Sequence, residues 1–241
     1  DVINWNGIKI VLPKDLLEAT HTSLAKTALL SRVSIKENKH LCIIGFYLQN
    51  PGDLLPHATF FSNELYAKSD DEHYCYYHLG NGFYIFVVKV TEKNIFFQAF
   101  SDKNQLLGSL TWHTLRLMNK QINIYPESRG LFLPHRSELH QTPLISFDKG
   151  CYKGQEIIAR THYRATLKHE LRIYSINSDE PVHSGQKIYP VDEEIELGEV
   201  VDYSFLANNR YLIAISILKE APTTIRLEGQ TPSITLESAS I

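Results

Sequence analysis

The sequence contains only three cysteines, an odd number that is too small for a disulfide framework. No segment has the successive basic, apolar and small-residue regions of a secretory signal. Long apolar runs are missing too, because the most apolar stretch, at 41–48, is only as long as a strand, whereas a membrane helix needs roughly 18 residues. We therefore expect a protein of the reducing cytoplasm that does not enter a membrane.

A surplus of positive charge is also absent. The chain has 24 Lys and Arg residues against 27 Asp and Glu residues, which gives a formal net charge of -3. Because positive charge holds nucleic acid largely through counterion release, we expect no direct nucleic-acid binding beyond a local contact. Hydrophobic residues make up 43% of the chain and charged residues 21%, which is typical of a globular protein and not of a disordered one.

Common catalytic and metal-binding motifs are missing as well. The absence of GxSxG, of a Walker loop and of GxGxxG argues against a hydrolase, an NTPase and a dinucleotide-binding protein. Eleven histidines form no HExxH motif, and His135 and His140 are five residues apart, a poor spacing for one helix face. Three cysteines cannot supply the four thiolates of an iron–sulfur cluster. We expect no metal site from this chain alone.

The first part of the chain predicts alternating strands and helices. A strand at 7–13 is followed by a helix at 15–30 that places Leu17, Leu24 and Ala28 on one stripe.

Further along, two extended segments surround a polar turn at 37–39, and the Asn-Gly pair within 80–82 predicts a hairpin between two aromatic strands. A helix at 93–107 and an apolar run near Leu115 complete the order β, α, β, β, α, β, which suits a ferredoxin-like α+β module over residues 1–118.

The last part of the chain reads differently. After His169, short strand-like segments are separated by polar turns every 8 to 15 residues, which predicts a small closed or nearly closed β-barrel at 169–241. Residues 119–168 then form a connecting segment between the two parts. The expected fold class is α+β.

The densest functional signal lies in this connecting segment, at 145–164. Gly150 and Gly154 leave the backbone free for positive φ or for close approach of another molecule. Between them, Cys151 is flanked by Lys149 and Lys153 and precedes a short predicted helix.

Nearby cations and a helix N-terminus both favour a thiolate, so a lowered pKa is expected at Cys151. The other two cysteines lie in apolar strand patterns and are expected to be buried.

The residues KGCYKGQEIIAR at 149–160 closely resemble the signature of YgfZ-like folate-binding proteins, a branch of the glycine-cleavage T-protein (aminomethyltransferase) superfamily. Trp112 and the stretches INIYPES at 122–128 and LFLPHRSEL at 131–139 resemble the part of these proteins that precedes the signature.

The resemblance implies a T-protein-like, ring-shaped fold of three parts that binds tetrahydrofolate or a derivative in its central opening. It also implies a role in maintaining iron–sulfur enzymes, including those that thiolate tRNA, with iron–sulfur proteins or their assembly factors as partners. Family members usually have a further segment before the equivalent of Gly7. Because the chain begins at Asp1 and its single methionine is Met118, we expect a fragment or a processed product.

The same resemblance implies which residues act. It makes Cys151, with Lys149, the candidate for catalysis, and it gives as candidates for binding the cofactor Asp148, Gly150, Tyr152, Gly154, Gln155, Glu156 and Arg160.

Three of these residues have an alternative reading. Asp148 either pairs with the donor edge of a pterin or caps a helix or turn. Glu156 either contacts the ligand or favours the dipole of the helix that it begins. Arg160 either anchors the glutamate tail or phosphate of a ligand, or is exposed or salt-bridged.

Two other functions remain open. One is a folate-dependent one-carbon (aminomethyl) transferase, in which a carboxylate handles the proton. The other is a non-catalytic interaction module whose folate pocket has decayed.

Overall fold

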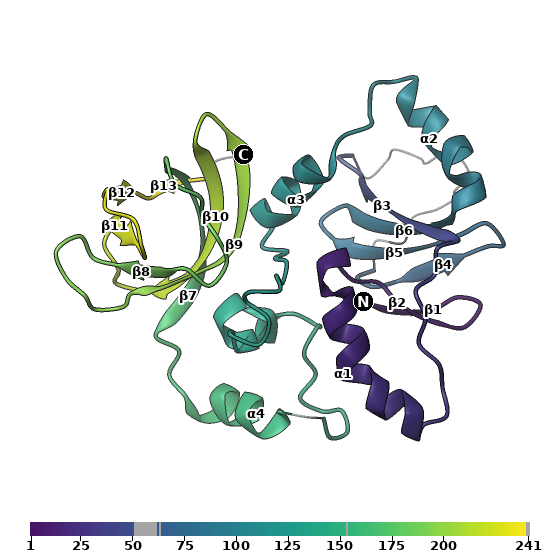
Figure 1. Cartoon of the computed structure of the whole chain (residues 1–241), viewed down its shortest axis with the longest axis horizontal. Helices are drawn as coiled ribbons and strands as arrows, with labels where there is room; N and C mark the ends of the chain where they lie inside the picture. The colour runs from purple at the N-terminus through teal and green to yellow at the C-terminus, as the bar shows by residue number, and fades with distance from the viewer. Residues whose placement is uncertain (51–61, 63, 153, 240–241) are drawn as a thin grey trace. The chain divides into compact units, whose positions relative to one another are not determined.

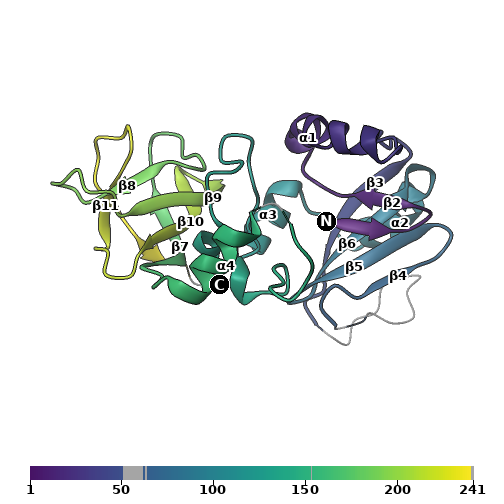
Figure 2. The same cartoon turned by 90° about the horizontal axis from the view of Figure 1, so that it is seen from below.

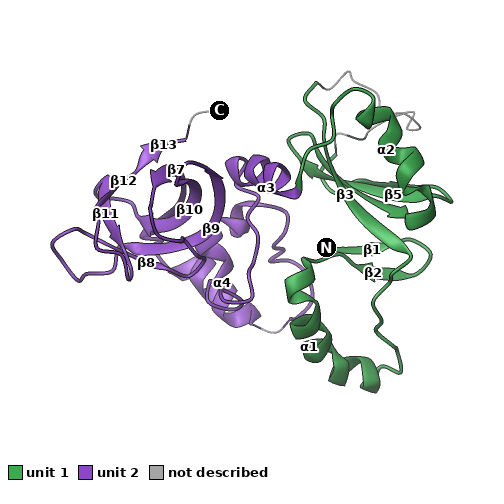
Figure 3. Ribbon diagram, turned by 45° about the horizontal axis from the view of Figure 1, so that its top comes forward, with its two compact units in different colours: residues 1–108 green, residues 109–241 purple. Residues whose placement is uncertain are grey.

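The computed structural model describes residues 1–50, 62, 64–152 and 154–239 (Figure 1). The chain is mixed α/β and divides into two compact units, Asp1–Gly108 and Ser109–Ile241 (Figure 3).

Unit 1 is built on an antiparallel sheet whose described strands run in the order β3-β6-β5-β4. The expected hairpin is confirmed, because β5 and β6 pair across Asn81 and Gly82, which both have positive φ. A side chain at Gly82 would also meet the carbonyl oxygen of Leu48 at 2.3 Å. The elements of unit 1 are β1 (Val2–Asn4), β2 (Ile8–Ile10), η1 (Lys14–Leu16), α1 (Leu17–Leu30), β3 (Leu41–Tyr47), β4 (Lys68–Asp70), β5 (Tyr74–Gly80), β6 (Phe83–Lys89), η2 (Val90–Glu92) and α2 (Lys93–Ser101).

The two faces of this sheet are covered by different elements. On one face, α2 packs aromatic rings against the sheet, with Phe96 and Phe86 centroids 5.1 Å apart. On the other face lies the hairpin β1–β2, where the Tyr77 hydroxyl donates to the Asp1 carboxylate at 2.8 Å. Figure 2 shows this hairpin beside the sheet.

The first predicted helix is confirmed as α1, but its expected stripe is only partly buried. Ala28 is buried, whereas Leu17 remains 38% exposed. The segment before the polar turn at 37–39 is not a strand, although β3 follows that turn as expected.

The ferredoxin-like order expected for residues 1–118 is wrong. The strand β2 pairs with β1 as a separate hairpin and does not join the four-stranded sheet among the described residues. The apolar run near Leu115 is helix α3 in unit 2, not a final strand. Periodicity cannot separate a short buried strand from a buried helix, and here Leu117 is fully buried against the outer face of the barrel.

Unit 2 contains the predicted barrel, which is confirmed as a nearly closed sheet of seven described strands in the order β12-β11-β8-β9-β10-β7-β13. The chain near Leu236 nearly closes it, because β12 pairs with β11 while β13 pairs with β7. The elements of unit 2 are α3 (Ser109–Met118), η3 (Pro134–Ser137), η4 (Leu139–Gln141), α4 (Gln155–Arg164), β7 (His169–Asn177), β8 (Lys187–Tyr189), β9 (Gly198–Ala207), β10 (Arg210–Leu218), β11 (Thr224–Leu227), β12 (Ile234–Thr235) and β13 (Glu237–Ser238).

Strand β10 explains why this part of the sequence is so apolar. Ile213, Ile215 and Ile217 fill the barrel interior, while Leu212 and Ala214 on the opposite face pack against α3 and the segment that follows it. Because both faces are covered, the strand is a nearly continuous apolar run instead of an alternating one.

Candidate functional site

The signature loop, which we define as the described residues 148–152 and 154, precedes α4 as the sequence predicts. The helix begins at Gln155, and its N-cap Gly154 has the left-handed φ of +91°. The backbone N–H of Gln155 donates to the Tyr152 carbonyl at 3.2 Å, and the Gln155 side-chain oxygen accepts from the Tyr152 N–H at 3.4 Å. These two bonds fix the loop where it enters the helix.

Both glycines of the loop border open space. A Cβ atom added at Gly150 or Gly154 would meet no other atom within 4 Å. Gly150 does not share the positive φ of Gly154, so its backbone suits any residue. The backbone at these two glycines is therefore open to close approach by another molecule.

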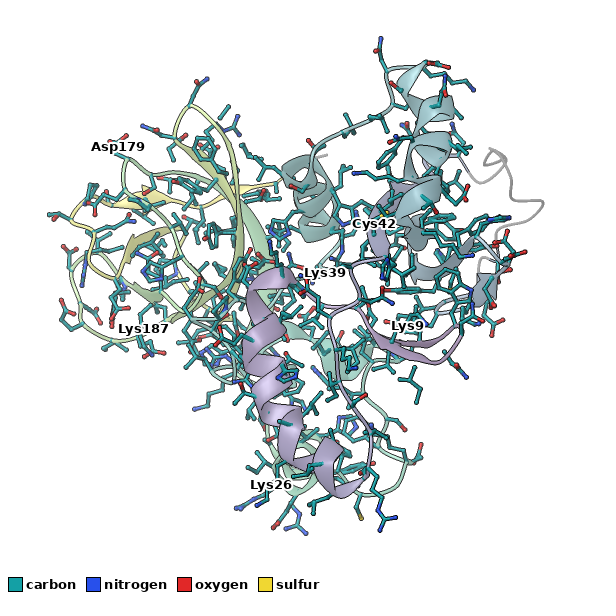
Figure 4. All side chains as sticks on the ribbon, turned by 45° about the vertical axis from the view of Figure 1, so that its right-hand side comes forward. Lys9, Lys26, Lys39, Cys42, Asp179 and Lys187 are labelled. Atoms are coloured by element: carbon teal, nitrogen blue, oxygen red, sulfur yellow. The ribbon has the colours of Figure 1, made fainter. Side chains whose placement is uncertain are left out.

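The three cysteines are free thiols in contrasting places. Cys151 is exposed. Cys42 lies half-buried on β3 (Figure 4), and burial raises the pKa of its thiol. Cys75 is completely buried, and burial raises its pKa to about 11. The expectation that the other two cysteines pack as small hydrophobes is met fully by Cys75 and in part by Cys42, and Cys151 is the accessible thiol.

The structure brings together only some of the predicted site residues. The Lys149 ammonium lies 4.8 Å from the centre of the Tyr152 ring, a cation–π contact. Asp148, Glu156 and Arg160 are exposed and, among the described residues, contact none of the other site residues through hydrogen bonds or ion pairs. Lys153, the second predicted cation beside Cys151, lies outside the described residues.

The segment LFLPHRSEL anchors α4 to the barrel. Arg136 on η3 pairs with Glu199 of β9, and its Nε donates to the Ser216 hydroxyl of β10 at 2.8 Å. Glu138 accepts from the Leu171 N–H of β7 at 3.1 Å and pairs with Lys120 at 2.9 Å. Helix α4 packs against η3. We call residues 131–139, which are bonded to the barrel and contact α4, the platform.

Three histidines meet where α4 contacts this platform, and sequence reasoning missed them. The ring centroids of His135 and His140 are 4.7 Å apart, and His162 on α4 lies 6.3 Å from each. Phe147 stacks on His162 at 3.9 Å. We call His135, His140 and His162 the histidine cluster.

A second group that the sequence did not predict surrounds the completely buried Asp202 on β9. One carboxylate oxygen accepts from the Tyr125 hydroxyl at 2.6 Å, and the other accepts from the Asn123 N–H at 2.6 Å. The Nε2 atom of His113 on α3 lies 3.0 Å from the first of these oxygens. This buried network joins α3 and the INIYPES segment to the barrel.

The network raises the pKa of both His113 and Tyr125. Burial lowers the pKa of His113, but the hydrogen bond and the charge of Asp202 outweigh it, and the net shift is upward. Burial raises the pKa of Tyr125, and Asp202 raises it further. His113 Nδ1 is also engaged, at 2.9 Å from the Asn123 amide nitrogen. The network therefore holds elements together and does not present a free base.

The chain is similar in sequence to known proteins over most of its length. No protein-family model matches the chain. The tRNA-modifying protein YgfZ of Pectobacterium carotovorum is 26% identical over 202 residues, which cover 80% of the chain and 57% of that protein. YgfZ of Klebsiella pneumoniae is 27% identical over 197 residues, or 80% of the chain and 58% of its own length. YgfZ of Vibrio atlanticus is 22% identical over 213 residues, covering 86% and 60%. The chain is YgfZ-like.

This YgfZ-like chain spans a little more than half the length of the relatives it matches. No described helix has the length and apolar character needed to cross a membrane. Among the residues that the structure describes, no three His, Cys, Asp or Glu side chains are placed to hold a metal ion.

The sequence of the YgfZ-like chain contains signals for the groups that were missed. Asp202 interrupts the apolar run of β9, and a carboxylate in a buried strand needs partners. The five-residue spacing of His135 and His140 does not suit one helix face, but two successive 3-10 helices separated by Glu138, with φ of 55°, bring their rings together.

Proposed function

We propose that this YgfZ-like chain acts as a folate-binding accessory protein that supports iron–sulfur cluster assembly or repair, and through it iron–sulfur-dependent tRNA modification. The observation that carries the proposal is the exposed Cys151 in an open signature loop that is fixed to α4. The printed name of the relatives, tRNA-modifying protein, supports the tRNA part. Three free thiols fit a reducing cytoplasm.

The proposal includes tetrahydrofolate or a derivative as the cofactor and a T-protein-like fold to hold it. Among the described residues, the exposed Asp148 carboxylate has no hydrogen-bond partner, so both oxygens are available to the donor edge of a pterin. The Arg160 guanidinium is likewise available to the carboxylates of a glutamate tail.

The loop glycines suit the same ligand, since the open space beside them admits a flat ring against the backbone. The folate would supply one-carbon chemistry when bound. The side chains of this chain would bind and orient it, and the exposed Cys151 would face a partner, such as an iron–sulfur protein or an assembly factor.

Complementation tests the role of Cys151. In cells that lack the full-length protein, we expect Cys151→Ser to restore iron–sulfur-dependent tRNA thiolation at least about tenfold less well than the wild type, because the serine hydroxyl is not a nucleophile near neutral pH. The matched control is Cys42→Ser, a half-buried thiol, which should restore thiolation like the wild type. Equal rescue by both variants would remove Cys151 from the proposal.

Turnover separates the proposal from an aminomethyl transferase. An accessory protein is expected to bind folate without consuming an aminomethyl donor. Steady turnover of such a donor by the full-length protein would favour the transferase instead.

A further inference from the structure

The histidine cluster contains buried polar atoms that lack partners. His135 is 5% exposed, and within the described part of the chain neither of its ring nitrogens has a hydrogen-bond partner. The Nδ1 atom of His140 is buried in the same way. Buried polar atoms without partners are rare in folded proteins, and each destabilises the structure, so this concentration at one contact calls for a physical role.

The close packing of the rings favours the neutral form of the three histidines over the protonated form. Three imidazoles within 6.3 Å of one another repel strongly once two of them are protonated. Phe147 stacked on His162 adds an apolar wall and no acceptor for a proton. The packed arrangement therefore suits neutral rings.

We infer that the histidine cluster is a pH-sensitive latch, which holds α4 against η3 and η4 while its rings are neutral and releases α4 when they take up protons. The helix that carries the signature residues Glu156 and Arg160 would then loosen as the pH falls. The latch depends only on the packing of unit 2, so it holds whether or not the chain binds folate.

The charged groups around the cluster do little to offset this repulsion. Glu138, between η3 and η4, is the acid beside it, and its carboxylate is already bonded to Lys120 and to the backbone of β7. Helix α4 contributes two cations, Arg160 and Arg164, against one acid in its first turn.

Strand β7 also packs against η3, but its charges are engaged elsewhere. Glu170 pairs with Arg172, and His169 lies near Arg136, whose charge helps to lower the pKa of His169 after burial. No acid of β7 is therefore free to compensate a protonated cluster among the described contacts.

The direction of the pH effect follows from the two innermost rings. The pKa of His135 is lowered mainly by burial and further by the neighbouring His140 and His162 rings. The pKa of His140 is lowered mainly by burial and further by His162, and the opposing charge of Glu138 does not reverse the shift. Because the pKa is lower in the packed state than in the unfolded state, the cluster contributes its full stability above the unfolded pKa of about 6.5. This stability is lost as the pH falls below about 6.5 and through the pKa of the packed state.

Hydrogen exchange of α4 against pH tests the latch. In the full chain, after correction for intrinsic exchange rates, the protection of residues 155–164 should fall by up to about tenfold per pH unit below 6.5 for each proton taken up on opening. The strand β10 serves as an internal reference and should keep its protection. If α4 and β10 change in parallel, the latch is wrong.

Variants identify the rings. His135→Gln and His140→Gln keep a polar side chain without a titrating group, so each should flatten the pH dependence of α4 protection by up to about tenfold per pH unit. His21→Gln, at an exposed position on α1, is the matched control and should leave the slope unchanged.

An NMR titration of the histidine C2–H resonances in the wild type gives a reading that needs no variant. Coupled titration of the His135 and His140 rings below about pH 6.5 supports the latch. Independent titrations of His135 and His140 with unshifted midpoints, or an unchanged slope in both the His135→Gln and the His140→Gln variant, would overturn it.

Discussion

The two glycines of the signature loop differ in backbone conformation, although both lie beside open space. Gly154 has a φ of +91°, which an L-amino acid with a side chain adopts only with strain, whereas the backbone of Gly150 suits any residue. Both lie beside open space, so neither glycine is required by crowding within the described structure. Their roles can be told apart by the same substitution.

We predict that Gly154→Ala destabilises the start of α4 by about 1 kcal/mol, because the alanine Cβ opposes the left-handed backbone. Gly150→Ala should change local stability by less than about 0.5 kcal/mol. Hydrogen exchange of residues 155–164 measures both effects. Equal protection in the two variants would show that the N-cap conformation does not matter.

At the scale of elements, one buried carboxylate adds hydrogen bonds to the apolar packing that attaches α3 and the segment after it to the barrel. Asp202 accepts hydrogen bonds from Tyr125 and from the backbone of Asn123, which lie 77 and 79 residues away in sequence. The Tyr125 ring also stacks on Tyr203 at 5.3 Å between centroids. Removing one donor would leave part of a buried charge unsatisfied.

Tyr125→Phe keeps this ring packing but removes the hydroxyl donor, so we expect a loss of about 1–3 kcal/mol in the free energy of unfolding. The control is Tyr163→Phe, since Tyr163 is 69% exposed, and its effect should stay within about 0.5 kcal/mol. Urea denaturation of both variants gives the comparison. Similar losses would mean that the Asp202 network contributes nothing specific.

Elements defined by local chemistry could be predicted from the sequence. The Asn81-Gly82 pair fixes the β5–β6 hairpin, and Gly154 before an apolar-polar repeat fixes the start of α4. The run near Leu115 could not be assigned, because its helix is selected by packing on the barrel and not by local pattern.

The part of the candidate site that could not be predicted from the sequence depends on contacts between distant segments. The exposed loop and Cys151 follow from glycines and neighbouring polar residues. In contrast, the histidine cluster depends on how η3, η4 and α4 fold back on one another, and neither His135 nor His162 has a local signature. Candidate residues whose position depends on neighbouring residues could be predicted from the sequence. Residues that come together only through tertiary contacts could not.

For the whole molecule, the barrel is the fixed reference within unit 2. Its strands bury an isoleucine-rich interior, and its outer face binds α3 and the platform under α4. Unit 1 has a separate aromatic core on its own sheet. The proposed folate function therefore rests on the open loop that unit 2 presents, and it is best tested in the full-length protein.

Calorimetric titration of tetrahydrofolate into the full-length protein tests whether the signature loop forms part of a folate site. We predict saturable binding that Asp148→Asn weakens by about tenfold or more, because a charge-assisted hydrogen bond to the ligand is lost. Asp192→Asn, at another exposed carboxylate of unit 2, should bind like the wild type. Binding no tighter than about millimolar, or equal binding by both variants, would contradict folate binding at the signature loop.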